Sequence, residues 1–151
     1  MRVIQLTFFA FLFFHFSCSS DEPYKEVIST KDAPGAIGPY SQAIKTGNTI
    51  YVSGQIALNP GSGKFVEGGI KEQTHQVIKN IQKILKAAGY TLIDVVQCQV
   101  YLADLNDYEE MNKVYLQYFK EQPPARAVVE VKRIPRDALV EIMVIASKKE
   151  E

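Results

Sequence analysis

An arginine and a glutamate near the end of the chain have the residue types and spacing to handle a small carboxylate substrate. Arg126 opens one expected strand, residues 126–132, and Glu141 lies in the next, residues 139–147. Arginine offers a planar fork of donors that matches a carboxylate, and glutamate can take up or return a proton. The two side chains could meet at one end of a sheet. They could also form a purely structural ion pair between neighbouring strands.

The elements that must position this pair follow from the hydrophobic pattern. Strands are expected at residues 25–29, 48–57, 95–102, 126–132 and 139–147. Helical spacing predicts one helix over residues 69–88, ended by Gly89, and a second that starts at Asp107 and stops at Pro123. The order β-β-α-β-α-β-β predicts an α+β domain with two helices on one face of the sheet.

The expected sheet has more apolar surface than two helices can cover. We assign Val128, Leu139, Met143 and Ile145 to the face away from the helices. An apolar sheet face has to be buried against something. We therefore expect a homo-oligomer whose sheets pack face to face, with a site at the sheet edge lying between subunits.

The composition excludes several classes of function. Seventeen basic and 17 acidic residues leave no net charge, so no nucleic-acid partner is expected. The two histidines and two cysteines lack metal-ligand spacing, and Cys98 is expected to pack as a small hydrophobic residue. The chain contains no phosphate-binding loop, hydrolase elbow or dinucleotide fingerprint. Neither a metal nor an organic cofactor is expected.

The N-terminus has the pattern of a targeting segment. Residues 1–17 combine a charged start at Arg2 with an apolar run too short to span a bilayer, as in a signal peptide. Cys18 resembles the lipidated cysteine of bacterial lipoproteins, although His15 and Phe16 depart from the usual lipobox. Residues 18–24 would then be a tether and residues 25–151 the folded domain. An ordinary cleaved signal and an uncleaved anchor are the alternatives.

This pattern predicts an exported protein that is tethered to a membrane. The lipid would hold it in the periplasm or on the surface of a Gram-negative bacterium. The lipid anchor would be its only membrane contact.

Four separated motifs resemble the Rid family of reactive intermediate deaminases. They are residues 33–42 (APGAIGPYSQ), 53–56 (SGQI), 104–107 (DLND) and 124–142, which begins with PAR and ends with VEI. The resemblance implies a chorismate-mutase-like fold with a mixed sheet, and a homotrimer with clefts between subunits. It also implies hydrolysis of 2-imino acids such as 2-iminobutanoate and 2-iminopropanoate, or their enamine tautomers, to 2-keto acids and ammonia.

The resemblance further implies roles for individual residues. Arg126 matches the arginine that pairs with the substrate carboxylate, and Glu141 matches the glutamate that positions or activates water. Residues expected to bind substrate are Tyr40, Ser53 and Gly54 in the cleft, and Asn112 on the second helix.

Two residues, Gly54 and Val128, bear on this assignment. Gly54 interrupts its strand, which independently indicates a bulge or a close approach of another group. Val128 stands where other family members often have a cysteine. Hydrolysis of an imine does not need that thiol, so the departure bears on thiol-based regulation more than on the reaction.

A non-catalytic module that binds a small carboxylate or a protein is the second hypothesis. The export signal favours it, because the pyridoxal-phosphate enzymes that release imines are cytosolic. The joint presence of Tyr40, Ser53, Arg126 and Glu141 favours the enzyme. Deamination of a different imine outside the cytosol would satisfy both observations.

Overall fold

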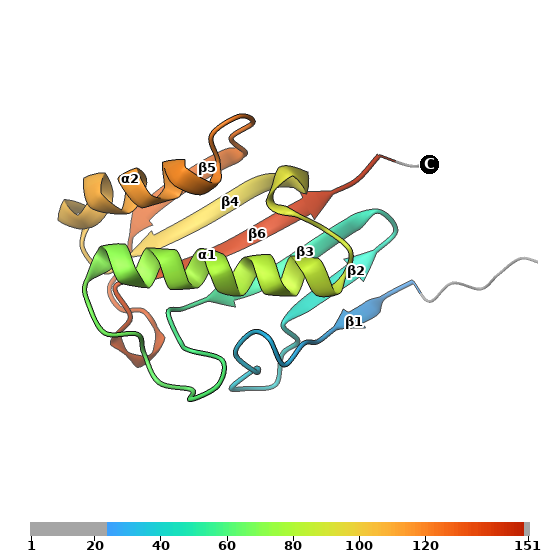
Figure 1. The fold of residues 1–151 in the computed structure, drawn as a ribbon, viewed down its shortest axis with the longest axis horizontal. Coiled ribbons are helices and arrows are strands. Elements are labelled where there is room, and N and C mark those ends of the chain that lie inside the picture. The colour runs from blue at the N-terminus through green and yellow to red at the C-terminus, as the bar shows by residue number, and fades with distance from the viewer. Residues whose placement is uncertain (1–23, 150–151) are drawn as a thin grey trace, which may run out of the picture.

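Six strands and two helices follow one another in the computed structural model, which describes residues 24–149 (Figure 1). The strands are β1 (Glu26–Ile28), β2 (Ala43–Thr46), β3 (Thr49–Gln55), β4 (Val95–Leu102), β5 (Ala125–Glu130) and β6 (Val140–Ser147). The helices are α1 (Ile70–Ala87) and α2 (Tyr108–Tyr118). The α+β class is confirmed, and the structure adds one strand, β2, that the sequence did not predict.

Strand β2 is four residues long and turns directly back into β3. Thr46 lies opposite Thr49, so Gly47 and Asn48 alone form the turn. Gly47 has a φ of 52°, a left-handed conformation that glycine adopts at little steric cost. This Gly-Asn pair was the one sequence signal for the hairpin.

The sheet is mixed, and β6 lies at its centre. The strand order is β1-β2-β3-β6-β4-β5. Strands β4 and β5 are parallel and are connected through α2, whereas the other pairs are antiparallel. The β4–α2–β5 crossover places β5 at the edge, so the returning β6 pairs on the other side of β4. The expectation that the strands of Arg126 and Glu141 are neighbours is therefore wrong.

Helix α1 covers the sheet with the apolar stripe that its sequence predicts. Val77, Ile81, Ile84 and Leu85 are at most 1% exposed and belong to the same core as the inner residues of β3, β4 and β6. Burying a side chain of this size stabilises the fold by about 1.5–3 kcal/mol. Cys98 lies in this core as a free, fully buried cysteine, as predicted.

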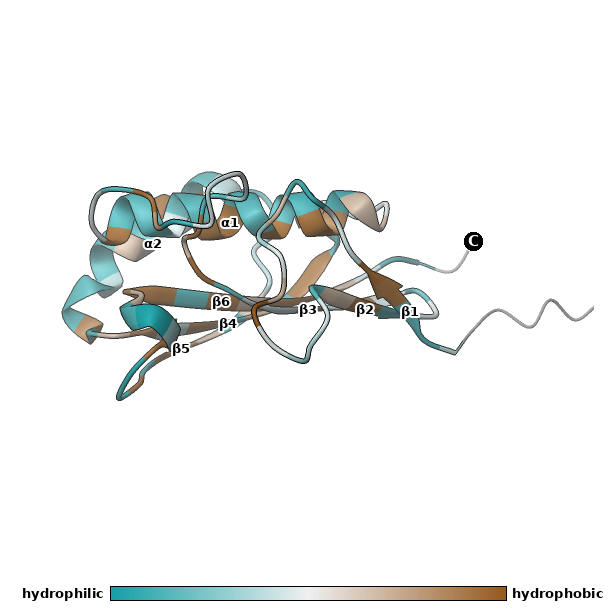
Figure 2. Ribbon diagram, turned by 90° about the horizontal axis from the view of Figure 1, so that it is seen from below, coloured by the Kyte–Doolittle hydropathy of each residue, from teal (hydrophilic) through white to brown (hydrophobic). Residues whose placement is uncertain are grey.

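The two helices cover one face of the sheet and leave the other face open (Figure 2). Met143 and Ile145 lie on the open face as predicted, together with Tyr51, which is 47% exposed. Val128 and Leu139 were assigned to this face but pack against the core on the helix side. Val128 pairs in the sheet with a buried core residue of β4, and its side chain therefore lies on the helix side.

The predicted signal peptide, Cys18 and residues 18–23 of the tether lie outside the described residues. Over residues 24–149, neither helix combines the length and the hydrophobicity needed to cross a bilayer.

Candidate active site

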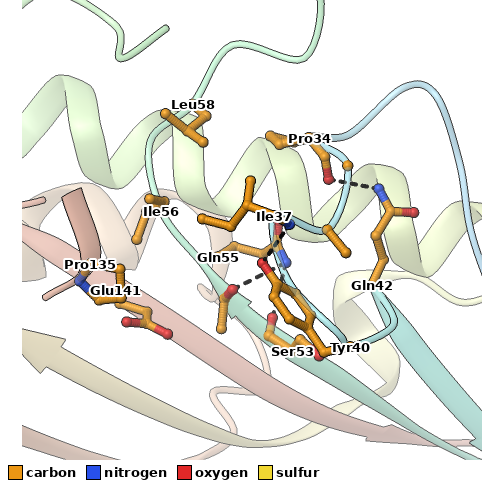
Figure 3. A pocket seen from close by; sticks show the side chains of 13 residues that line it. Pro34, Ile37, Tyr40, Gln42, Ser53, Gln55, Ile56, Leu58, Pro135 and Glu141 are labelled. Carbon is orange, nitrogen blue, oxygen red and sulfur yellow. Dashed lines mark hydrogen bonds between the residues drawn. The ribbon is translucent and has the colours of Figure 1, made fainter. Parts of the chain in front are cut away.

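A pocket of about 340 Å³ opens where the loop before β2 passes over neighbouring ends of β3 and β6 (Figure 3). Four of the predicted site residues line it: Tyr40, Ser53, Gly54 and Glu141. Most of the remaining lining is apolar and comes from Pro34, Ala36, Ile37, Ile56, Leu58 and Pro135. The pocket thus combines a few polar groups with an apolar wall, as sites for small organic molecules do.

Glu141 reaches the pocket from the open face of β6 and lies against the backbone of β3. The pairing of β3 with β6 shifts register between Val52 and Gln55, and Gly54 sits in this irregular segment. A Cβ atom at Gly54 would lie 2.8 Å from Cδ of Glu141. The predicted close approach at Gly54 is therefore confirmed, since only a residue without a side chain leaves room for the carboxylate.

The environment of the Glu141 carboxylate is that of a candidate base. Burial raises the pKa of Glu141 above its ordinary value near 4.5. No lysine or arginine of residues 24–149 forms an ion pair with it. A carboxylate whose pKa is raised towards neutrality accepts a proton more readily at physiological pH.

Tyr40 and Ser53 are fixed beside Glu141 by local hydrogen bonds. The backbone N–H of Ile37 donates to the hydroxyl of Tyr40 at 3.2 Å. The hydroxyl of Ser53 donates to the carbonyl oxygen of Ser41 at 2.7 Å. Both hydroxyl oxygens keep acceptor or donor capacity that can be turned to a ligand.

Gln42 holds the loop that forms the pocket wall, and sequence analysis did not single it out. Its Nε2 donates to the carbonyl oxygens of Thr30, Ala33 and Pro34, and its Oε1 accepts from the N–H of Thr30. The side chain is 4% exposed. One buried amide therefore satisfies four backbone groups of a loop that has no regular secondary structure. A lone glutamine has no periodicity by which such a role could be recognised.

Arg126 lies outside this pocket, on the edge strand β5 beside helix α2. Its Cζ is 4.4 Å from the centroid of the Tyr115 ring and 5.9 Å from that of Tyr108. Its Nη2 donates to the hydroxyl of Tyr108 at 3.3 Å. No acidic side chain in the described part of the chain forms an ion pair with Arg126. Asn112 lies between Tyr108 and Tyr115 in the sequence, at the spacing that puts all three on one side of α2.

Arg126 and Glu141 point to opposite faces of the sheet. On β4, Arg126 lies opposite Cys98 and Glu141 lies opposite Tyr101. Those two positions are an odd number of residues apart, and successive residues of a strand face opposite ways. Arg126 therefore faces α2, whereas Glu141 faces the open side. A structural ion pair between them within one chain, the alternative considered from the sequence, is wrong.

The described residues thus form two separate half-sites. The base half-site contains Glu141, Gly54, Ser53 and Tyr40, and the arginine half-site contains Arg126 with Tyr108 and Tyr115. The spacing along α2 puts Asn112 on the side of the helix that carries these two tyrosines. In residues 24–149, no three histidine, cysteine, aspartate or glutamate side chains are grouped as metal ligands would be. The two half-sites can bind a carboxylate and supply a base, provided that they are brought together.

Comparison with known proteins places this arrangement among relatives that match nearly the whole folded part. Residues 30–148 match the family described as Endoribonuclease L-PSP. A RutC family protein of Pyrococcus horikoshii is 56% identical over 124 residues, which cover 82% of this chain and 98% of that protein. The human 2-iminobutanoate/2-iminopropanoate deaminase is 50% identical over 122 residues, which cover 81% of this chain and 89% of that protein.

A solved structure shares the fold. The crystal structure of E. coli TdcF with bound serine has a TM-score of 0.79 and 37% identity, and the match covers 82% of this chain and 99% of TdcF.

Proposed function

We propose that this chain, which belongs to the Endoribonuclease L-PSP family, hydrolyses 2-imino acids to 2-keto acids and ammonia. That family includes the Rid proteins. The expected substrates are 2-iminobutanoate and 2-iminopropanoate. The human relative bears the name of this activity at 50% identity.

The observation that carries the proposal is that neither Arg126 nor Glu141 forms an ion pair among the described residues. A half-buried charge without an oppositely charged partner costs stability, so its presence needs a reason other than folding. A 2-imino acid has a carboxylate for Arg126 and, one bond away, an electrophilic C2 that Glu141 can supply with water. The substrate therefore complements the two groups that the chain leaves free.

The two half-sites come together in the proposed homotrimer. Arg126 of one chain and Glu141 of another would share a cleft, because in a single chain they face away from each other. The open sheet face supports such an assembly, since it exposes Tyr51 and carries Met143 and Ile145. In a closed ring, each chain would lend its arginine half-site to one neighbour and its base half-site to the other.

The first step adds water to the protonated imine. The guanidinium of Arg126 binds the substrate carboxylate through two N–H groups and thereby fixes the position of C2. Glu141 removes a proton from water as the water oxygen bonds to C2, and the C=N π electrons move to nitrogen. The product of this step is a carbinolamine, with a hydroxyl and an amino group on C2.

The second step expels ammonia. Glu141, now protonated, gives its proton to the amino group and becomes a carboxylate again. The C–N bond breaks, the oxygen forms the C=O of the 2-keto acid, and the hydroxyl proton passes to the same carboxylate or to water. Acid–base help of this kind accelerates a reaction by typically about 10²–10⁴-fold.

A direct assay tests the proposal. A chain that begins at Tyr24 is mixed with an amino-acid oxidase that generates 2-iminobutanoate, and loss of the imine is followed with and without the protein. We expect acceleration by the wild type and none by the Arg126→Ala variant, which should retain its fold and oligomeric state. Equal imine loss with and without the wild type would overturn the proposal.

Binding of a small carboxylate without turnover is the second candidate. It is supported by the TdcF structure, whose bound serine has a carboxylate next to a nitrogen-bearing carbon. Calorimetry would then detect binding of 2-oxobutanoate by a wild-type protein that does not accelerate imine loss.

We also propose that the protein is exported and tethered through a lipid on Cys18. The support is the sequence pattern of residues 1–18 together with a family match that begins only at residue 30. Metabolic labelling with a radioactive fatty acid tests it directly. Label on the wild type but not on the Cys18→Ala variant is the expected result, and an unlabelled wild type would contradict it.

A further inference from the structure

We propose that Tyr108 is a positioning residue that fixes the guanidinium of Arg126 in the plane in which it receives the substrate carboxylate. This inference rests on the proposed function, because it assigns a task to a residue that supports the carboxylate anchor. It extends that function to a residue of α2 that need not touch the substrate.

The guanidinium of Arg126 lies against an aromatic shelf, our term for the stacked rings of Tyr115 and Phe119. Its Cζ is 4.4 Å from the centroid of the Tyr115 ring, within the range of a cation–π interaction. The Tyr115 ring is itself stacked on Phe119, with centroids 4.4 Å apart and an angle of 27° between the planes. Tyr115 and Phe119 are each 5% exposed, so the shelf is held by the core.

A shelf alone does not fix which edge of the guanidinium points outwards. Contact with a ring face limits movement towards the ring, but it leaves the flat cation free to slide and turn above it. A directional hydrogen bond removes this freedom. Tyr108 supplies one, because its hydroxyl accepts from Nη2 of Arg126 at 3.3 Å.

Tyr108 is well placed for the task. It is the first residue of α2 and lies seven residues before Tyr115, which puts both rings on the same side of the helix. Tyr108 is 38% exposed, so its hydroxyl lies at the rim, where a ligand would enter. The shelf and the hydrogen bond therefore come from one rigid element.

The remaining donors of Arg126 are free for a ligand. A guanidinium has five N–H donors, and one is engaged by Tyr108. In residues 24–149, Arg126 has no other side-chain hydrogen bond and no ion pair. By holding one Nη2 proton, Tyr108 leaves a pair of parallel N–H groups oriented for both oxygens of a carboxylate.

The test removes the hydroxyl and keeps the ring. Tyr108→Phe should raise KM for 2-iminobutanoate roughly threefold to tenfold, because the hydrogen bond that it removes acts on the substrate only through the orientation of Arg126, while kcat changes less than twofold. Tyr118→Phe is the matched control, since it removes another hydroxyl of α2, one that pairs with His75 at 2.9 Å. It should leave both constants unchanged.

A second measurement separates positioning of the carboxylate anchor from a general structural effect. The dissociation constant of 2-oxobutanoate should rise in Tyr108→Phe by the same factor as KM. That of 2-oxobutanamide, which lacks the carboxylate, should not change. The inference would be overturned by weaker binding of both ligands, by an unchanged KM, or by a fall in kcat alone.

Failure of the proposed function is distinguishable from failure of this inference. If the wild type binds 2-oxobutanoate without hydrolysing imines, the deaminase proposal fails, and weaker binding by Tyr108→Phe still supports the role of Tyr108. A wild type that neither reacts nor binds would overturn both.

Discussion

The carboxylate of Glu141 lies in the place that a side chain at position 54 would take, so it fits only because residue 54 is a glycine. The two residues belong to β3 and β6, which are neighbours in the sheet but are separated in sequence by both helices. The register shift between β3 and β6 and the absence of a side chain at Gly54 thus make room for the proposed base.

Adding one methyl group at this point should displace the base. We expect Gly54→Ala to lower kcat about 10²-fold, because a displacement of about 1 Å of a reacting group can cost that much. Steady-state kinetics measures the effect. Gly61→Ala is the control, since the nearest atom to its new Cβ would be 3.5 Å away. Full activity of Gly54→Ala would contradict the role assigned to Glu141.

The raised pKa of Glu141 predicts a pH dependence of activity. The base works as a carboxylate, so kcat should fall as the pH drops through a pKa that lies above 4.5. A pH–rate profile of the wild type should show this acid limb. Glu141→Gln should be at least about 10²-fold slower and should lack the limb. An acid limb that persists in the variant would assign the titration to another group.

The same pKa shift predicts a pH dependence of stability. Burial raises the pKa in the folded state, so the folded state favours the protonated acid. The stability that this contributes is fully present below the unfolded pKa near 4.5 and is lost as the pH rises through the folded pKa. Glu141→Gln, which is neutral at every pH, should therefore gain stability over the wild type between about pH 4 and pH 7. Urea unfolding at both pH values measures the difference, and a constant difference would contradict the shift.

Arginine at position 126 should not be replaceable by lysine. Arg126→Lys keeps the charge but loses the planar fork, so one of two charge-assisted hydrogen bonds to the carboxylate is lost. We expect KM to rise roughly tenfold to a hundredfold, since such bonds contribute about 1.5–3 kcal/mol. The control is Arg133→Lys, because Arg133 pairs with Asp137 and its own side chain does not line the pocket of Glu141. A KM within twofold of the wild type would argue against bidentate binding.

A mixture of two inactive variants should recover activity if the half-sites come from different chains. Arg126→Ala and Glu141→Gln chains are unfolded together in equal amounts and refolded. A cleft works only when it draws its arginine from one variant and its glutamate from the other, so about a quarter of the clefts should be active. The refolded mixture is compared with each variant refolded alone. No recovery from correctly assembled trimers would place the whole site within one chain.

Gln42 should be more important to the fold than its position in a loop suggests. Gln42→Leu removes four hydrogen bonds of the loop before β2 and leaves its backbone groups unsatisfied. We expect a loss of about 1–3 kcal/mol in the free energy of unfolding. Gln82→Leu, on the exposed side of α1, should change it by less than about 0.5 kcal/mol. Equal effects of the two changes would contradict the role of Gln42.

The predictions from sequence succeeded where one element buries one regular face. The apolar stripe of α1 gave its position to within one residue at each end, and alternation identified the two faces of β6. Glu141 stood out because it interrupts an otherwise apolar strand. The interruption by Gly54 correctly indicated a close approach.

Strand order could not be obtained in this way. Alternation shows that a strand has two faces, but it does not identify the neighbours of that strand or which face is turned to the helices. For this reason Val128 was assigned to the wrong face, and the strands of Arg126 and Glu141 were expected to be neighbours. Strand β2 was missed because its four residues, Ala43–Thr46, do not alternate between apolar and polar side chains.

The burial of Cys98 protects the one thiol of the described domain from oxidants. Cys98 is fully buried in the core, and burial raises the pKa of its thiol to about 11. At neutral pH only about one thiol in 10⁴ would be a thiolate, which is the reactive form. Cys98 is the only cysteine of residues 24–149, so the described domain presents no exposed thiol for disulfide exchange. Oxidation therefore finds no exposed cysteine through which it could cross-link two such domains.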